Sequence, residues 1–231
     1  MSIHSDFQKL NTSADTPTRQ WVQKYLGSDK PTLCIKSAVI KQMAKDKLAT
    51  ITNSNDFFIL VDDIYTQATT FEEMALAAAI FTKGDKFHDV TEINWLEKWL
   101  DKTVGWAEVD SLCQSSISAD NLLKNWSLWH KQLIKFSYNE NVHKRRASMV
   151  LLCRSLREST DSRLSELAFE LVESLKGEKP ILITKAISWV LRCAVKHHPD
   201  ELAIYIENQK NTLPKIAYRE TLKKLTTGRK S

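Results

Sequence analysis

The segment Leu182-Ile-Thr-Lys-Ala-Ile-Ser-Trp-Val-Leu-Arg-Cys193 repeats its apolar residues at the spacing of a helix. These residues form a single stripe: Leu182, Ala186, Trp189, Val190 and Cys193. With 3.6 residues per turn, such a stripe covers one face of a helix, whereas a half-buried strand would alternate apolar and polar residues. We therefore expect a helix over residues 180–197.

The same periodicity recurs through almost the whole chain, and no stretch alternates as a strand does. The other expected helices are bounded by Asn, Ser, Asp, Gly or Pro and lie near residues 16–26, 35–48, 55–66, 70–83, 91–101, 105–117, 119–136, 142–158, 162–176, 199–209 and 214–226. The 231 residues include only five glycines and five prolines, too few for the turns of a sandwich or barrel. The sequence thus predicts an all-α protein.

A weak internal repeat favours a solenoid over a globular helical bundle. Cys113, Cys153 and Cys193 are 40 residues apart, and Trp106, Arg146 and Trp189 are 40 and 43 residues apart. Paired-helix repeats of the HEAT or armadillo type have a period of about 40–47 residues. Each repeat contributes one inner helix to a concave surface. We predict a HEAT-like helical-repeat solenoid that forms a single domain over residues 1–231.

Composition and spacing exclude several other classes. The apolar runs are far shorter than the roughly 20 residues of a membrane-spanning helix. No basic start followed by an apolar stretch marks a signal peptide, so we expect a cytoplasmic protein. The glycines never cluster into a phosphate-binding loop, and the cysteines and histidines lack metal-ligand spacing. We expect four buried free thiols, no metal, no cofactor and no membrane association; nothing points to an oligomer, so a monomer is expected.

Charge is distributed unevenly along the chain. Residues 53–73 contain five acids and no Lys or Arg, whereas residues 141–157 contain five Lys or Arg and no acid. Residues 210–231 contain seven Lys or Arg and one acid. Basic segments of this kind suit a polyanionic partner such as DNA. The alternative is an ordinary solvated surface with a basic tail.

One carboxylate lies where an apolar residue is expected. The predicted helix over residues 105–117 has Asp110 inside its apolar stripe, one turn after Trp106. Burying a carboxylate costs free energy unless it is paired or faces a cavity, which makes Asp110 a candidate functional acid. The alternative is a structural Asp that caps a helix or pairs with an Arg.

Two further residues occupy comparable positions on later helices. Arg146 lies one turn before the apolar stripe of the helix over residues 142–158, where its guanidinium could grip a phosphate or pair with a buried acid such as Asp110. Trp189 is the largest residue of its stripe and could equally fill the core. All of these residues fall on the expected inner helices of successive repeats.

Three segments resemble the signature segments of the AlkD-type DNA alkylation repair glycosylases. They are Gly105-Trp-Ala-Glu-Val-Asp110, Asn141-Val-His-Lys-Arg-Arg-Ala147 and Lys185-Ala-Ile-Ser-Trp-Val-Leu-Arg192. Segments starting at Tyr25 and Ile35, and the closing segments starting at Pro199 and Tyr218, also resemble that family. The resemblance therefore spans nearly the whole chain.

The resemblance implies HEAT-like repeats around a concave basic groove that binds double-stranded DNA, and release of cationic alkylated bases, chiefly 3-methyl- and 7-methylpurines. The aromatic–acid pair of the family falls on Trp106 and Asp110, its functional Arg on Arg146 and its second groove Trp on Trp189. Other basic residues are candidate contacts to the DNA backbone: Lys36, Lys41, Arg145, Arg154, Lys215 and Arg219.

The chain also departs from the family. Gly105 stands where a second aromatic is frequent, and Tyr65 stands where a Trp is common. Cys34 and Ala38 replace a Gly and a Pro, and Lys36 takes the place of a polar residue that can approach the DNA. Two alternatives stay open: a non-catalytic HEAT-repeat protein that binds distorted DNA, and a helical scaffold that binds proteins.

Overall fold

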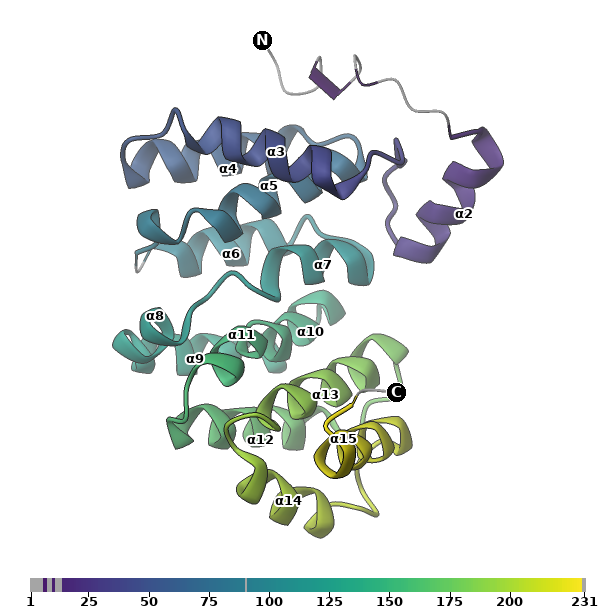
Figure 1. Ribbon diagram of the computed structural model, residues 1–231, viewed down its shortest axis with the longest axis vertical. Coiled ribbons are helices and arrows are strands. Elements are labelled where there is room, and N and C mark those ends of the chain that lie inside the picture. Colours follow the sequence, from purple (N-terminus) through teal and green to yellow (C-terminus); the bar gives the residue numbers. More distant parts are fainter. Residues whose placement is uncertain (1–5, 8–9, 11–13, 90, 230–231) are drawn as a thin grey trace. The chain divides into compact units, whose positions relative to one another are not determined.

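The computed structural model describes residues 6–7, 10, 14–89 and 91–229 (Figure 1). All regular secondary structure within these ranges is helical, which confirms the all-α prediction. None of the helices in the described part of the chain is long and apolar enough to cross a membrane. The chain divides into two compact units, Met1–Leu112 and Cys113–Ser231. The single repeat domain over residues 1–231 stays a prediction.

The first unit is built from six α-helices and a short 3-10 helix over its described residues. In chain order these are α2 (Thr16–Leu26), α3 (Ser37–Leu48), α4 (Ser54–Gln67), α5 (Phe71–Lys83), η1 (Asp85–Phe87), α6 (Glu92–Leu100) and α7 (Gly105–Cys113), whose last residue belongs to the second unit. Helix α5 packs on α3 and α4, and α4 also packs on α6. A capping box between Thr70 and Glu73 begins α5.

Aromatic side chains fill the core of this unit. The Phe57 ring packs against Phe81 and Phe87, and the fully buried Trp99 stacks on Tyr65. Trp99 donates its indole N–H to Asp62 over 3.0 Å, which joins α6 to α4. Tyr65, a departure from the family pattern, is therefore a core residue of the first unit.

The second unit contains, over its described residues, the helices α8 (Ala119–Lys124), α9 (Trp126–Ser137), α10 (Val142–Val150), α11 (Leu152–Glu158), α12 (Ser162–Leu175), α13 (Ile181–Ala194), α14 (Pro199–Asn208) and α15 (Lys215–Thr227). The prediction of a single helix over residues 119–136 is wrong, because the backbone leaves the helical conformation at Asn125. The side-chain amide of Asn125 donates instead to the carbonyl and side-chain oxygens of Asn121. The helix expected over residues 142–158 is interrupted only at Leu151, and the one expected to reach residue 117 ends at Cys113.

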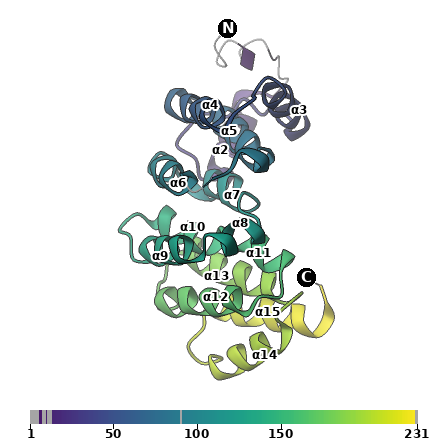
Figure 2. The same cartoon turned by 90° about the vertical axis from the view of Figure 1, so that its left-hand side faces the viewer.

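Helix α13, formed by the segment with the clearest apolar stripe, lies at the centre of this unit. It packs against α10, α11, α12, α14 and α15, and Figure 2 shows it between α10 and α12. The Ser188 hydroxyl donates to Glu220 of α15 over 2.6 Å, and Arg192 lies 3.6 Å from the same carboxylate. These bonds fasten α15 to the central helix.

A buried carboxylate fixes the connection between α2 and α3 in the first unit. Glu72 accepts hydrogen bonds from the Thr32 hydroxyl at 2.7 Å, from the Leu33 backbone N–H at 2.9 Å and from the Ile35 backbone N–H at 3.3 Å. Only 2% of Glu72 is exposed. A side chain of α5 therefore holds the connection, in addition to the local bonds that the connection makes itself.

Replacing Glu72 by Ala is expected to lower the free energy of unfolding by about 2–4 kcal/mol, because three donors lose a charged acceptor. Urea unfolding followed by circular dichroism measures the change. The control is Glu166→Ala, an exposed acid of α12, which should change stability by less than about 0.5 kcal/mol. Equal stability of both variants would contradict this role of Glu72.

Candidate functional site

Trp106 and Asp110 lie one turn apart on α7, so they share a face of the helix. Asp110 is 7% exposed, as expected for a carboxylate within an apolar stripe, and Trp106 is half-buried. Both belong to the first unit. The structure therefore places an indole and a carboxylate side by side on the helix where the sequence predicts them.

Two glycines bring the end of α2 against the start of α7. Gly27 and Gly105 both have left-handed φ angles, 68° and 80°. A Cβ atom on Gly105 would lie 2.1 Å from the carbonyl oxygen of Gly27, so no side chain fits there. The departure from the family aromatic at Gly105 thus has a structural reason in this chain. We name this contact, with the side-chain bonds described next, the α2–α7 clasp.

Glu108 provides the polar part of the α2–α7 clasp. The residue is only 2% exposed. Its carboxylate accepts a hydrogen bond from the Ser28 hydroxyl and another from the Val104 backbone N–H over 2.9 Å. Lys30 lies 3.8 Å away. Burial raises the pKa of the Glu108 carboxyl above its ordinary value, although the hydrogen bonds from Ser28 and Val104 act in the opposite direction. The sequence contained one signal for this residue, an acid in the first turn of a helix.

An aromatic row extends from the clasp along α2. We use this term for Trp21, Tyr25 and Trp106. Trp106 donates its indole N–H to the Tyr25 carbonyl oxygen over 2.8 Å and meets the Tyr25 ring edge-on at 5.5 Å between centroids. Tyr25 in turn stacks on Trp21 at 5.7 Å with the ring planes 7° apart. The orientation of Trp106 is therefore set by contacts within the first unit.

Arg146 and Trp189 belong to the second unit and are linked through α13. Arg146 is 4% exposed, and its guanidinium donates to the carbonyl oxygen of Leu182 over 2.5 Å. Leu182 precedes the half-buried Trp189 by seven residues, about two turns of the same helix. The structure thus shows a buried Arg that contacts the backbone of α13, a contact that the sequence did not predict.

The two pairs lie in different units, Trp106 with Asp110 in the first and Arg146 with Trp189 in the second. Within each unit, the structure places the paired residues on one helix or on two helices that pack together. The convergence of all four side chains on one surface stays a prediction that rests on the repeat spacing and the family resemblance.

The six predicted contacts to the DNA backbone divide into two groups. Four are exposed: Lys36, Lys41, Lys215 and Arg219. Arg145 pairs with Glu178 at 2.8 Å and donates to two backbone carbonyls, of Asn139 and Glu140. Arg154 pairs with Glu158 at 2.7 Å and donates to the Ser115 carbonyl. A phosphate contact from either of these arginines would have to replace bonds within the protein.

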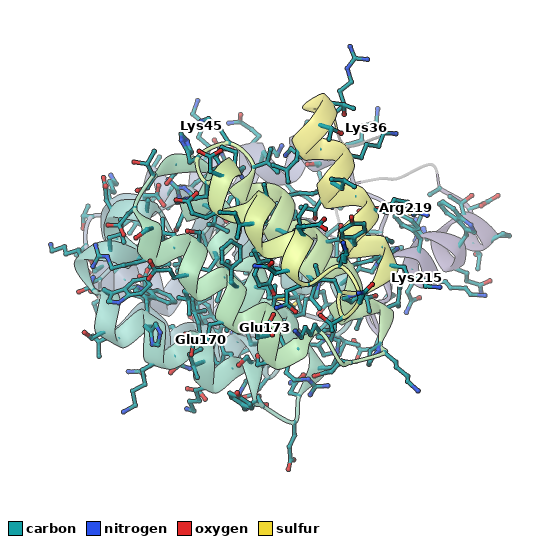
Figure 3. All side chains as sticks on the ribbon, turned by 90° about the horizontal axis from the view of Figure 1, so that it is seen from below. Lys36, Lys45, Glu170, Glu173, Lys215 and Arg219 are labelled. Atoms are coloured by element: carbon teal, nitrogen blue, oxygen red, sulfur yellow. The ribbon has the colours of Figure 1, made fainter. Side chains whose placement is uncertain are left out.

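Charge is segregated between two helices of the second unit. Helix α12 exposes Glu166, Glu170 and Glu173, whereas α15 exposes Lys215 and Arg219. Figure 3 labels Glu170 and Glu173 on α12 and Lys215 and Arg219 on α15. Glu220, the acid of α15, is bonded to Ser188 and lies near Arg192. Both helices pack on α13, which carries Trp189, and α15 is the basic one of the two.

Cys193, four residues after Trp189, is a buried group whose ionisation the sequence did not reveal. A hydrogen bond from Cys153 and the nearby Arg157 guanidinium, 3.3 Å from the sulfur, lower the pKa of the Cys193 thiol to about 7 against the opposing effect of burial. Cys113, Cys153 and Cys193 are buried free thiols as predicted, whereas Cys34 is half-buried.

Several histidines contact backbone carbonyls or an acid: His88, His130, His197 and His198. His88 and His198 place their Nε2 atoms 2.9 and 3.0 Å from the carbonyl oxygens of Phe81 and Ser159. Among residues 14–89 and 91–229 and the few described before them, no group of three or more His, Cys, Asp or Glu could hold a metal ion.

A sequence model of the family described as "DNA alkylation repair enzyme" matches residues 7–225. The chain belongs to this family. A solved structure, "Predicted DNA alkylation repair enzyme from Enterococcus faecalis", is similar with a TM-score of 0.74 and 19% identity, over 95% of this chain and 100% of that one. The likeness shows a shared helical-repeat fold, while no curated protein matches the chain. Family membership supports a role in the repair of alkylated DNA.

Gly105→Ala is expected to lower the free energy of unfolding by about 2–4 kcal/mol, because the new Cβ meets the Gly27 carbonyl in a left-handed conformation. The matched control is Gly177→Ala, where a Cβ meets nothing within 4 Å. Urea unfolding of both variants gives the comparison. A Gly105→Ala protein as stable as Gly177→Ala would contradict the close contact in the α2–α7 clasp.

Thiolate absorbance is expected to titrate with a pKa of about 7 in the wild type and to lose that step in Cys193→Ser. The folded pKa lies below the ordinary thiol value of 9.0, so the thiolate stabilises the fold at high pH, and this contribution is lost as the pH falls through about 7. Arg157→Gln should raise the pKa, and Cys113→Ser should leave it unchanged. A first thiolate appearing only near the ordinary value would contradict the assignment.

Proposed function

We propose that this protein is a DNA N-glycosylase of the AlkD type, which releases cationic N3- and N7-alkylated purines from duplex DNA in base excision repair. The observation that carries the proposal is the pairing of Trp106 with the buried Asp110 on α7, held in place by the α2–α7 clasp. Family membership and the three resembling segments support it.

The charge of the substrate removes the need for a general acid in the enzyme. Alkylation at N3 or N7 makes the purine a cation, so the base leaves without protonation by a general acid. The electron pair of the N-glycosidic bond passes to the base and neutralises it, while the sugar develops oxocarbenium character. Water then forms the new bond at the anomeric carbon and loses a proton. A hydrolysis of this kind therefore needs a fixed negative charge near the sugar rather than a general acid near the base.

Asp110 is the proposed source of that charge. Its carboxylate would stabilise the sugar cation and orient the attacking water. Because the residue is only 7% exposed, the charge would act in a poorly hydrated setting, where it is worth more than in bulk water. The neighbouring backbone of α7 is already anchored by Glu108, so the carboxylate would need little reorganisation.

Trp106 and Trp189 are proposed to present aromatic faces to the same cationic sugar, at about 0.5–2 kcal/mol each. The indole N–H of Trp106 is bonded to Tyr25, so its orientation is set before DNA arrives. Arg146 is proposed to hold a phosphate near the lesion. Its bond to Leu182 gives it a second role, the positioning of the helix that carries Trp189.

We further propose that duplex DNA lies in a concave basic groove of HEAT-like repeats, without sequence preference and with affinity that falls steeply with salt. The exposed cations are the first candidates for its phosphates: Lys36, Lys41, Lys215 and Arg219. We expect a cytoplasmic monomer that needs no cofactor.

Two observations favour a second candidate function, a non-catalytic protein that binds distorted DNA. Asp110 is nearly covered, and Gly105 replaces a family aromatic beside it. Such a protein would keep the basic surface and bind damaged duplexes with the same salt dependence, but it would release no base.

Release of 7-methylguanine and 3-methyladenine from methylated duplex DNA tests the proposal. Asp110→Asn should slow release by about 10²–10³-fold, because the charge that stabilises the transition state is lost. Arg146→Ala should also slow release. The control is Asp63→Asn, an exposed acid of the same unit, which should leave the rate unchanged.

Circular dichroism shows that each variant is folded before its rate is compared. DNA binding without release by the wild type would favour the non-catalytic function. Equal release by wild type and Asp110→Asn would keep the activity and remove this carboxylate from the mechanism.

A further inference from the structure

Helix α2 exposes two large aromatic side chains that the proposed hydrolysis does not use. Trp21 is 65% exposed and Tyr25 is 60% exposed. None of the residues Thr16–Leu26 is buried, so the helix does not serve the core of the first unit. Large aromatic groups held at the surface in this way indicate a binding surface rather than a role in packing the core.

The two rings are ordered by one another and by the candidate site. Trp21 and Tyr25 are four residues apart on the helix and stack with nearly parallel planes. Tyr25 also meets the edge of Trp106 and accepts the indole N–H of Trp106 at its carbonyl oxygen. Trp21 is thus the outer end of the aromatic row whose inner end is the proposed catalytic indole.

The charge of α2 indicates the chemistry of the partner. The helix contains Arg19 and Lys24 and no acid, and Lys24 is exposed on the turn between the two rings. Arg19 donates to the Ala14 carbonyl at the start of the helix. A basic surface with exposed aromatic faces matches a nucleic acid, because the cation meets phosphate and the ring meets a base or sugar.

We propose that Trp21 is a DNA-contacting residue that packs its indole against a nucleotide flanking the alkylated base. The inference rests on the proposed function for the position of the lesion, beside Trp106. Tyr25 acts as a positioning residue, since it supports the Trp21 ring from behind while it holds Trp106. The contact reads no sequence, because every nucleotide of a duplex offers the same sugar face.

This arrangement separates binding from chemistry. Trp21 touches neither Asp110 nor the reacting sugar in the proposed mechanism. Its loss should therefore weaken the complex with damaged duplex DNA while leaving the rate of bond cleavage in the formed complex nearly unchanged. A residue that merely stabilised the fold would lower the melting temperature instead.

The test measures the dissociation constant of a fluorescent duplex carrying one hydrolysis-resistant alkylpurine, together with single-turnover release of 7-methylguanine at saturating protein. Trp21→Ala should bind about ten- to a hundred-fold more weakly, in line with the loss of one stacking contact. Trp21→Phe should recover most of the affinity. The matched control is Tyr138→Ala, which removes an aromatic ring that is 73% exposed in the second unit and should bind as wild type.

The outcomes separate this inference from the proposed function. Weak binding by Trp21→Ala with an unchanged saturated release rate supports the inference. Weak binding in a protein that releases no base supports it too and overturns only the glycosylase activity. Wild-type affinity in Trp21→Ala, or a failure of Trp21→Phe to recover affinity, overturns the stacking contact whatever the release assay shows.

Discussion

The close approach of Gly27 to Gly105 is the constraint on which the candidate site of the first unit depends. Backbone meets backbone at this point, and the space for a Cβ atom is absent. This proximity lets Glu108 bond Ser28 across the contact, and it lets the Trp106 indole reach the Tyr25 carbonyl. The helix then carries Asp110 one turn further along the same face. A contact between two glycines thus fixes an indole and a carboxylate.

The sequence predicted what local periodicity determines. The apolar stripe of residues 180–197 identified the helix that lies at the centre of the second unit, and the spacing of Trp106 and Asp110 placed both on one face. It could not predict the α2–α7 clasp, because Gly27 and Gly105 come together only in the tertiary fold. It missed the break at Asn125 for the opposite reason, a local side-chain bond that competes with the helix.

The structure also changes the meaning of the basic segments. Residues 141–157 are rich in Arg, but two of these side chains are paired within the protein: Arg145 with Glu178 and Arg154 with Glu158. Glu178 lies 33 residues after Arg145, so no local pattern reveals the pair. The cations that remain exposed on α15 sit on a helix whose own acid is held by α13. Fewer cations are therefore available to DNA than the composition suggests, and they lie on fewer helices.

The position of a damaged nucleotide relative to α7 decides whether Asp110 can act as proposed. A crystal structure of the protein with a duplex that carries one hydrolysis-resistant alkylpurine measures this directly. We expect the Asp110 carboxylate beside the deoxyribose of that nucleotide, with the Trp106 ring against the same sugar. A lesion bound away from α7, or an Asp110 carboxylate still covered by protein in the complex, would contradict this expectation.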